Sequence, residues 1–207
     1  MAEPLDTELA DLPQPLRWRG WMARAEAVLF ASAEPVTREV LARVVGRDCA
    51  LELLIGDIAA ELADRPYEIV RVAGGWQFRT KPQHAVAIRA ARQEGDTNRD
   101  LTQNEALVLT IIAYMQPVTR SAISRLMGRE ISRDLIARLH RQTLIARGPR
   151  SPEPGAPYTY VTTPGFLVRF DLETLRDLPD IEALEDAGLL NPAADIALDL
   201  PIAAEDE

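Results

Sequence analysis

Apolar residues recur at helical spacing in two separate stretches of this sequence. The first stretch carries the series Trp21, Ala25, Val28 and Leu29. The second runs from Ala106 to Ala113 and follows Thr102-Gln103-Asn104-Glu105, which has the Thr-x-x-Glu pattern of a capping box. Because positions three and four apart share one face of a helix, both stretches are predicted to be amphipathic helices. Each helix is expected to end before a proline, at Pro35 or Pro117.

The two stretches belong to an internal repeat. A shift of 82 positions places Pro35-Val36-Thr37-Arg38 on Pro117-Val118-Thr119-Arg120, and Gly46-Arg47 on Gly128-Arg129. Neighbouring apolar positions follow the same shift. Self-similarity of this kind indicates a duplicated structural unit, so we interpret the chain as two copies of one module.

Two further helices are predicted in each copy. Thr37 and Thr119 are the expected N-caps of a short second helix, and Gly46 and Gly128 supply the turn that ends it. A third helix follows, with Ser132 as its expected cap in the second copy. The predicted buried stripes of the third helices are Leu51, Leu54, Ile55, Ile58 and Leu62 in the first copy, and Leu135, Ile136 and Leu139 in the second.

After the third helix the apolar period changes from that of a helix towards that of a strand. The segment Tyr67 to Thr80 reads as two strands around a tight turn at Gly74-Gly75, and 144–147 with 158–162 form the corresponding arms in the second copy. Three helices followed by a hairpin make a winged helix-turn-helix. The predicted fold class is therefore mainly α with small β-hairpin wings (α+β), as two tandem winged helix-turn-helix domains. The expected boundaries are a flexible N-terminal extension (1–17), a first domain (18–95), a second domain (96–178) and an acidic, largely disordered tail (179–207).

Composition excludes several classes of protein. The 207 residues include one cysteine, Cys49, and two histidines, His84 and His140. These cannot form an internal disulfide or a Cys/His zinc site. The start of the chain lacks the pattern of a secretory signal, and no apolar run is long enough to span a membrane, so a cytoplasmic protein is expected.

No constellation for catalysis stands out. A phosphate-cradling Gly-x-x-x-x-Gly-Lys loop is absent from the sequence. Asp134 lies six positions before His140, which is off the spacing that brings helix side chains together, so His140 is predicted to be an exposed helix residue. Cys49 lacks the electropositive surroundings that activate a thiol. We therefore predict a protein that is not an enzyme, with no catalytic residues, no cofactor and no metal.

Charge differs sharply between the two copies. From Asp48 to Asp64, both included, the predicted third helix of the first copy carries five acids and no basic residue, which disfavours contact with a phosphate backbone. Between Gln116 and Arg150 the second copy has eight arginines against Glu130 and Asp134, within a chain of net charge −9. Two interpretations stay open: Arg133, Arg138 and Arg141 contact DNA, or they form a solvated face in which Asp134 pairs with Arg138 or Arg141.

The C-terminal region changes composition again. From Asp171 to Glu207 there are twelve acidic residues and a single basic one, Arg176. Acidic segments of this kind are typical of flexible tails. Such a tail is expected to discourage nonspecific binding to nucleic acid, to dock onto a basic partner, or simply to keep the protein in solution.

Several segments of the chain match a known family. Leu29-Phe30-Ala31-Ser32-Ala33-Glu34-Pro35-Val36, the hairpin Val72 to Thr80, the block Ile111 to Arg120 and the segment Tyr160 to Leu167 resemble segregation and condensation protein B, in the same order and spacing. The closing signature of that family is similar to Phe170-Asp171-Leu172 followed by Asp177-Leu178-Pro179. Two blocks depart from the family pattern, Leu126-Met127-Gly128-Arg129 and Gly155-Ala156-Pro157.

The resemblance implies a non-catalytic, nucleoid-associated subunit of a bacterial condensin-like complex. Members of the family look like tandem winged-helix homodimers. They bind the central segment of the kleisin, segregation and condensation protein A, which bridges the heads of the SMC ATPase. The complex acts in chromosome condensation and segregation.

Particular side chains are candidates for these contacts. Aromatic residues dominate interface hot spots, so the predicted kleisin contacts are Tyr158, Tyr160, Phe166 and Phe170. Trp18 and Trp21 are the candidates for dimerisation. The alternative function is a winged-helix transcriptional regulator that reads DNA with the second module through Arg133, Arg138 and Arg141. In the condensin-like assignment DNA contact is weak or indirect.

Overall fold

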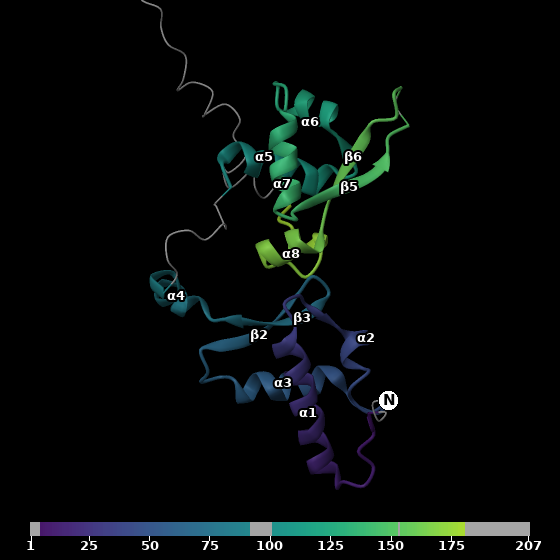
Figure 1. Cartoon of the computed structure of the whole chain (residues 1–207), viewed down its shortest axis with the longest axis vertical. Coiled ribbons are helices and arrows are strands. Elements are labelled where there is room, and N and C mark those ends of the chain that lie inside the picture. Colours follow the sequence, from purple (N-terminus) through teal and green to yellow (C-terminus); the bar gives the residue numbers. More distant parts are fainter. Residues whose placement is uncertain (1–4, 92–100, 153, 181–207) are drawn as a thin grey trace, which may run out of the picture. The chain divides into compact units, whose positions relative to one another are not determined.

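The computed structural model describes residues 5–91, 101–152 and 154–180. Two helical modules follow one another along the chain, and each carries a small antiparallel sheet (Figure 1). Both sheets have three strands, and in both the last strand lies in the middle, in the orders β1-β3-β2 and β4-β6-β5. The predicted fold class, mainly α with β-hairpin wings, is confirmed.

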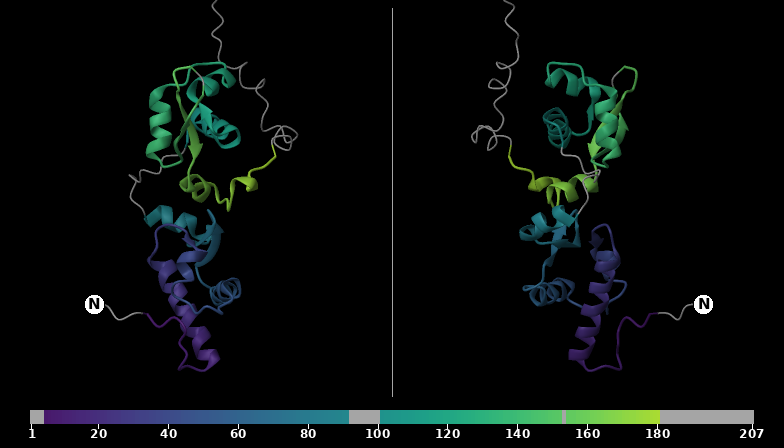
Figure 2. Two further views of the ribbon diagram at one scale, coloured as in Figure 1. Left: turned by 90° about the vertical axis from the view of Figure 1, so that its right-hand side faces the viewer. Right: turned by 60° about the vertical axis from the view of Figure 1, so that its left-hand side comes forward.

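The first module contains three helices, a hairpin and a short additional helix. The helices are α1 (Gln14–Ala31), α2 (Arg38–Leu41) and α3 (Leu51–Glu61), and the strands are β1 (Val36–Thr37), β2 (Tyr67–Val72) and β3 (Gly75–Thr80). A 3-10 turn (Pro82–His84) and α4 (Ala85–Ala91) follow. Helix α1 packs against α3 and β3 (Figure 2). The core of the module lies among these three elements.

The core of this module is the stripe predicted for the third helix together with residues of α1. All five predicted positions of that stripe are buried, with at most 6% of their surface exposed. Trp21, Ala25 and Leu29 of α1 belong to the same cluster. Each fully buried Leu or Ile contributes about 1.5–3 kcal/mol relative to exposure, which makes this stripe a main source of stability.

The second module repeats the order of elements. Its helices are α5 (Gln103–Met115), α6 (Arg120–Leu126) and α7 (Arg133–Arg141), and its strands are β4 (Val118–Thr119), β5 (Ile145–Arg150) and β6 (Tyr158–Thr162). Helix α8 (Pro164–Phe170) and a 3-10 turn (Leu175–Asp177) follow. The predicted stripe of α7 is buried, at Leu135, Ile136 and Leu139.

Three of the predicted caps form. The capping box at Thr102 and Glu105 is complete, and the hydroxyls of Thr119 and Ser132 accept hydrogen bonds from the backbone N–H groups of Ala122 and Leu135. Thr37 occupies the cap position of α2, but its side chain makes no capping hydrogen bond. The first module therefore holds its second helix with less local support.

The hairpin turn of the first module lies one residue earlier than predicted. The residues with positive φ are Ala73 (50°) and Gly74 (72°), whereas Gly75 is the first residue of β3. A Cβ atom at Gly75 would lie 2.7 Å from the carbonyl oxygen of Val36. Gly75 is therefore required by the close approach of β1, not by the turn itself.

The 82-residue shift holds for the starts of the first strand and of the second and third helices, and it ends at the wings. The pairs β1 and β4, α2 and α6, and α3 and α7 each begin 82 positions apart, whereas β2 and β5 begin 78 positions apart. The second hairpin has a longer connection, and its register shifts between Arg147 and Arg150. The wings are thus the part of the duplication that has diverged in geometry.

Part of the predicted N-terminal extension packs on the first module. Helix α1 begins at Gln14, inside the segment 1–17. Trp21 Nε1 donates to the carbonyl oxygen of Thr7 at 2.8 Å, and Arg24 donates to that of Asp6 at 2.6 Å. Of the predicted tail at 179–207, residues beyond 180 lie outside the described part of the chain.

The residues around the end of α8 contact the first hairpin. Backbone N–H groups of Ala73 and Gly74 donate to the carbonyl oxygens of Leu172 and Glu173 at 3.0 and 3.1 Å. Arg79 donates to the carbonyl oxygen of Val168 at 2.8 Å. The N–H groups of the hairpin turn are thereby satisfied by backbone.

Candidate functional site

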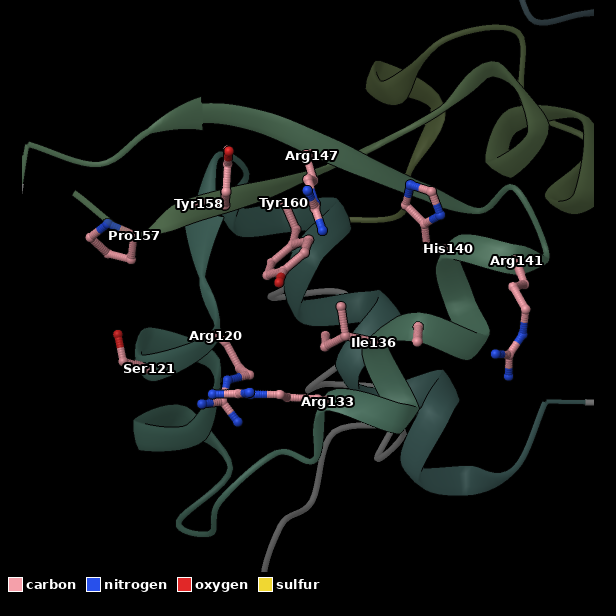
Figure 3. A pocket seen from close by; sticks show the side chains of 11 residues that line it. Arg120, Ser121, Arg133, Ile136, His140, Arg141, Arg147, Pro157, Tyr158 and Tyr160 are labelled. Carbon is pink, nitrogen blue, oxygen red and sulfur yellow. The ribbon is translucent and has the colours of Figure 1, made fainter. Parts of the chain in front are cut away.

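A groove of about 980 Å³ lies between α7 and the β5–β6 hairpin of the second module (Figure 3). We call it the α7–wing groove. Helix α6 contributes Arg120 and Ser121 to its lining; helix α7 and the hairpin contribute Arg133, Ile136, Ala137, His140, Arg141, Arg147, Pro157, Tyr158 and Tyr160. Four of the lining residues are arginines, and none is an aspartate or glutamate. The lining is thus positive, with an apolar and aromatic component.

The sequence of α7 explains why arginines face this groove. Leu135, Ile136 and Leu139 are buried, as expected for the apolar stripe of an amphipathic helix, and Ile136 also lines the groove. Arg133 and Arg141 lie eight positions apart, close to two helical turns, so they stand on one side at opposite ends of the helix. Burial of the apolar stripe therefore fixes the direction in which Arg133 and Arg141 point.

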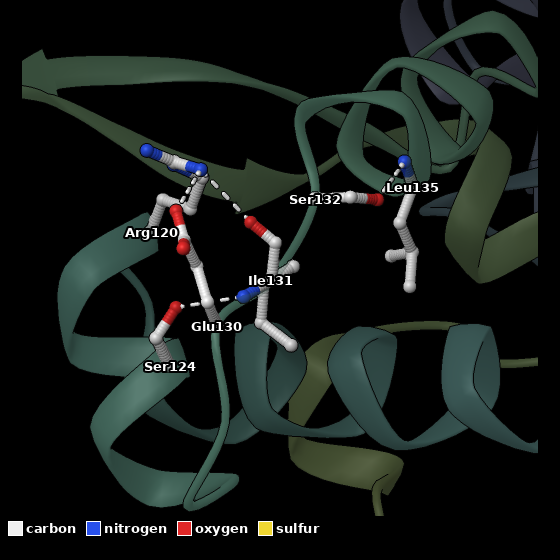
Figure 4. Close-up of polar contacts among 6 residues, drawn as sticks. All are labelled: Arg120, Ser124, Glu130, Ile131, Ser132 and Leu135. Carbon is white, nitrogen blue, oxygen red and sulfur yellow. Dashed lines mark hydrogen bonds and ion pairs between the residues drawn. The ribbon is translucent and has the colours of Figure 1, made fainter.

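The turn before α7 is held by a small polar network (Figure 4). Arg120 donates to the carbonyl oxygen of Ile131 at 2.9 Å and lies 3.5 Å from a carboxylate oxygen of Glu130. The backbone N–H of Ile131 donates to the hydroxyl of Ser124 at 3.0 Å. Arg120 is thus engaged in orienting α7, and its charge is partly offset by Glu130.

Tyr158 is clasped by two arginines of the wing. The guanidinium of Arg150 lies 4.1 Å from the centre of the Tyr158 ring, and that of Arg147 lies 4.9 Å from it. Arg150 also donates to the Tyr158 hydroxyl at 2.9 Å and to the carbonyl oxygen of Ala156 at 2.8 Å. Cation–π contacts of this kind are worth about 0.5–1 kcal/mol at exposed sites, so the ring and both arginines are held together.

Two of the three arginines predicted to contact DNA line this groove. Arg133 and Arg141 are exposed, and their side chains make no hydrogen bond or ion pair within the described part of the chain. His140 is exposed, as predicted, and lies between them on α7. These side chains leave uncompensated positive charge along one wall of the groove.

Arg138 has a different position. It does not line the groove, and its Nε donates to Glu105 of α5 at 2.8 Å instead of pairing with Asp134. Glu105 is only 5% exposed and also accepts from the backbone N–H of Thr102 at 2.9 Å. That backbone hydrogen bond, helped by the Thr102 hydroxyl and Arg138 and opposed by burial, lowers the pKa of Glu105 below its ordinary value of 4.5. Arg138 therefore stabilises the packing of α7 on α5.

The four aromatic residues predicted to contact a partner are not gathered in one place. Tyr158 and Tyr160 line the groove, and Figure 3 shows the Tyr160 ring extending from the wing towards α7. Phe166 is buried, whereas Phe170 is half-exposed and packs on it with ring centres 4.9 Å apart. Arg147, which sequence reasoning did not single out, joins the groove because the hairpin folds back over α7.

The two tryptophans considered for dimerisation pack inside the first module. Trp21 is buried in the core. Trp18 is partly buried, donates from Nε1 to Asp57 at 2.8 Å and meets Trp21 edge to face at 6.2 Å between ring centres. Both side chains thus have intramolecular partners, and their role in dimerisation stays a prediction.

Other kinds of site find little support in the described residues. No group of three or more His, Cys, Asp or Glu side chains placed to hold a metal ion occurs among them. Cys49 is partly buried, and burial raises the pKa of its thiol. The described helices include none that is long and apolar enough to cross a membrane.

Comparisons with known proteins agree in one family. The family model described as segregation and condensation complex subunit ScpB matches residues 23–181. Segregation and condensation protein B of Desulforamulus reducens is 38% identical over 161 residues, covering 76% of this chain and 87% of its own, and that of Bacillus subtilis is 29% identical over 85% and 90%. The solved structure of ScpB from Mycobacterium tuberculosis is 24% identical, covers 74% of this chain and 96% of its own, and superposes with a TM-score of 0.33.

Proposed function

This chain belongs to the ScpB family of segregation and condensation complex subunits, and we propose that it acts there as a non-catalytic adaptor that binds the kleisin subunit. The kleisin is segregation and condensation protein A, and through it the chain would reach the SMC ATPase. Family membership is the observation that carries the proposal. A cytoplasmic, nucleoid-associated location follows from the same role.

The α7–wing groove is the surface we assign to the kleisin. It is concave, and Tyr160, Tyr158 and Ala137 give it apolar and aromatic area, the kind of lining that dominates protein–protein hot spots. Phe170 is the remaining predicted contact that is exposed, and Phe166 supports it from beneath. Of the four predicted aromatic contacts, we therefore favour Tyr158 and Tyr160.

Light scattering after size exclusion tests the proposal directly. The full chain is analysed alone and after mixing with the central segment of the kleisin from the same genome. We expect a homodimer alone and a larger co-eluting complex in the mixture. Absence of a complex would favour the alternative, a transcriptional regulator that binds DNA with the second module.

A pair of variants tests whether the kleisin contacts the α7–wing groove. Tyr160→Ala is expected to weaken kleisin binding about thirtyfold or more, because truncation of an aromatic hot spot typically costs at least about 2 kcal/mol. Tyr67→Ala, which removes an exposed tyrosine of the first wing, is the matched control and is expected to bind like the parent. Equal binding by both variants would move the kleisin site away from the groove.

A further inference from the structure

We infer that the α7–wing groove selects an extended acidic peptide whose carboxylates pair with Arg133, Arg141 and Arg147. The inference rests on the proposed function, because the kleisin would supply that peptide. It adds the chemistry of the bound segment and the spacing of its charges.

The arginines in and beside the groove differ in whether they have an acidic partner. Arg120 and Arg138 are compensated by Glu130 and Glu105. Arg133 and Arg141 have no acidic partner within the described residues, and the groove lining contains no carboxylate. Guanidinium groups bind carboxylates in a forked geometry with two hydrogen bonds, so these arginines are poised for acidic side chains.

The length of α7 sets the spacing of those side chains. At about 1.5 Å rise per residue, the eight positions from Arg133 to Arg141 span about 12 Å. An extended peptide advances about 3.3 Å per residue, so it covers that distance in about four residues. The matching ligand therefore has two acidic residues about four positions apart.

The wall between the two arginines favours a peptide with an apolar residue between its charges. Ala137 lies midway along α7 and lines the groove, and Tyr160 extends from β6 towards α7 (Figure 3). The opposite wall is stiffened because Arg147 and Arg150 hold the Tyr158 ring. A pre-formed wall of this kind reduces the entropy lost when a peptide binds.

Duplex DNA fits this surface less well than an acidic peptide does. DNA also supplies negative charge, but its backbone has no apolar side chain to cover Ala137 and Tyr160. Arg138, one of the three arginines that would read DNA, is occupied by Glu105. The chain as a whole carries a net charge of −9, which repels a dense polyanion.

A matched pair of charge reversals tests the inference. Arg133→Glu with Arg141→Glu reverses the charge of the two groove arginines on α7. Arg43→Glu with Arg125→Glu makes the same change of net charge at exposed arginines outside the groove. Binding of the labelled kleisin segment to the full chain is measured by fluorescence anisotropy. We expect the groove variant to bind about 10–100-fold more weakly and the control variant to bind within about threefold of the parent. Added salt should weaken binding by the parent and the control more than binding by the groove variant.

Reversing the charges on the kleisin segment as well tests whether its acidic residues pair with the groove arginines. A kleisin segment in which two acidic residues about four positions apart are replaced by lysine should bind the groove variant better than the parent chain. Far-ultraviolet circular dichroism establishes that the variants are folded.

The outcomes separate the two proposals. If the parent chain does not bind the kleisin, both the proposed function and this inference fall. If it binds, and the groove variant equals the control, the inference alone is overturned. Retention of a duplex oligonucleotide by the parent at low salt that is lost in the groove variant would make the groove a nucleic-acid site instead.

Discussion

The two modules share an order of elements but use the third helix in different ways. Under the 82-residue shift, Arg133, Ala137 and His140 of α7 correspond to Leu51, Ile55 and Ile58 of α3. The three residues of α3 are buried, whereas those of α7 are exposed and line the groove. The first module thus buries these three positions of α3 in its own core, whereas the second module leaves the corresponding positions of α7 exposed to solvent.

Charge reinforces this difference. The acids of α3 are satisfied within the first module: Glu52 pairs with Arg38, Asp57 accepts from Trp18, and Glu61 pairs with Arg19. The groove-facing arginines of α7 have no such partners in the described part of the chain. The comparison teaches that the third helices bury different positions of the repeat, with Leu54 and Ile136 as the shared buried pair, so a duplicated fold changes its role when one helix turns another face outward.

The largest expected effect comes from the cores that the modules have in common. Leu41 and Ile123 lie 82 positions apart and are both fully buried. Leu41→Ala or Ile123→Ala should lower the free energy of unfolding by about 2–5 kcal/mol, because each leaves a cavity. Urea denaturation is followed by tryptophan fluorescence and by circular dichroism.

Because of where the tryptophans lie, this experiment also tests whether the two modules unfold independently of each other. Trp18, Trp21 and Trp76 all lie in the first module. Leu41→Ala should shift the fluorescence transition, and Ile123→Ala should shift mainly the transition seen by circular dichroism. If Ile123→Ala moved the fluorescence midpoint as far as Leu41→Ala does, the modules would unfold as one unit. The interpretation of two separately stable cores would then be wrong.

The centre of each sheet gives a second, smaller contrast. In register, Thr37 pairs with Gly75 in the first module and Thr119 pairs with Thr159 in the second. Thr159 is buried and donates to the carbonyl oxygen of Pro149 at 2.6 Å. The second module therefore accommodates a side chain at the position where the first requires glycine.

Gly75→Ala should consequently destabilise the first module by about 1–3 kcal/mol, because the new methyl group would overpack against Val36. The fluorescence transition in urea measures the loss. Gly56→Ala is the control, since a Cβ atom there meets no atom within 4 Å. A Gly75→Ala variant as stable as the parent would show that β1 moves aside at little cost.

The elements of the fold followed from local patterns, whereas the groove did not. The buried stripes of α3 and α7 and the capping box at Thr102 depend on residues within one or two helical turns, and each was predicted from such spacing. The hairpin turn was misplaced by one residue because Gly75 is fixed by β1, which is distant in sequence. Local patterning carries no information of that kind.

The candidate site was predicted only in part for the same reason. Arg133, Arg141, Tyr158 and Tyr160 were chosen for their residue types, but their meeting in one groove depends on how the hairpin folds over α7. The partner of Arg138 was also missed, because Glu105 lies 33 positions away and comes close only when α7 packs on α5. Whether an arginine of α7 has an acidic partner therefore depends on tertiary packing, which pairs Arg138 but not Arg133 or Arg141 within the described residues.

The smallest predicted effect concerns this Glu105–Arg138 pair, which the first module lacks. The corresponding positions there are Ala23 and Gly56. Glu105→Gln should lower the free energy of unfolding at pH 7 by about 1 kcal/mol, through a weaker capping box and the loss of the ion pair. A double-mutant cycle with Arg138→Gln, followed by circular dichroism, should give a coupling of about 0.5–1 kcal/mol.

The difference in unfolding free energy between the parent and Glu105→Gln should depend on pH in one direction. Because the pKa of Glu105 is lower in the folded chain than its ordinary value of 4.5, ionised Glu105 stabilises the fold above that value. The stabilisation is lost as the pH falls through the lowered pKa. The gap in unfolding free energy between the parent and Glu105→Gln should therefore be constant near neutrality and narrow below pH 4.5. A gap that stayed constant down to the acid transition would mean that Glu105 does not titrate in this way, and that α7 is held on α5 by apolar packing alone.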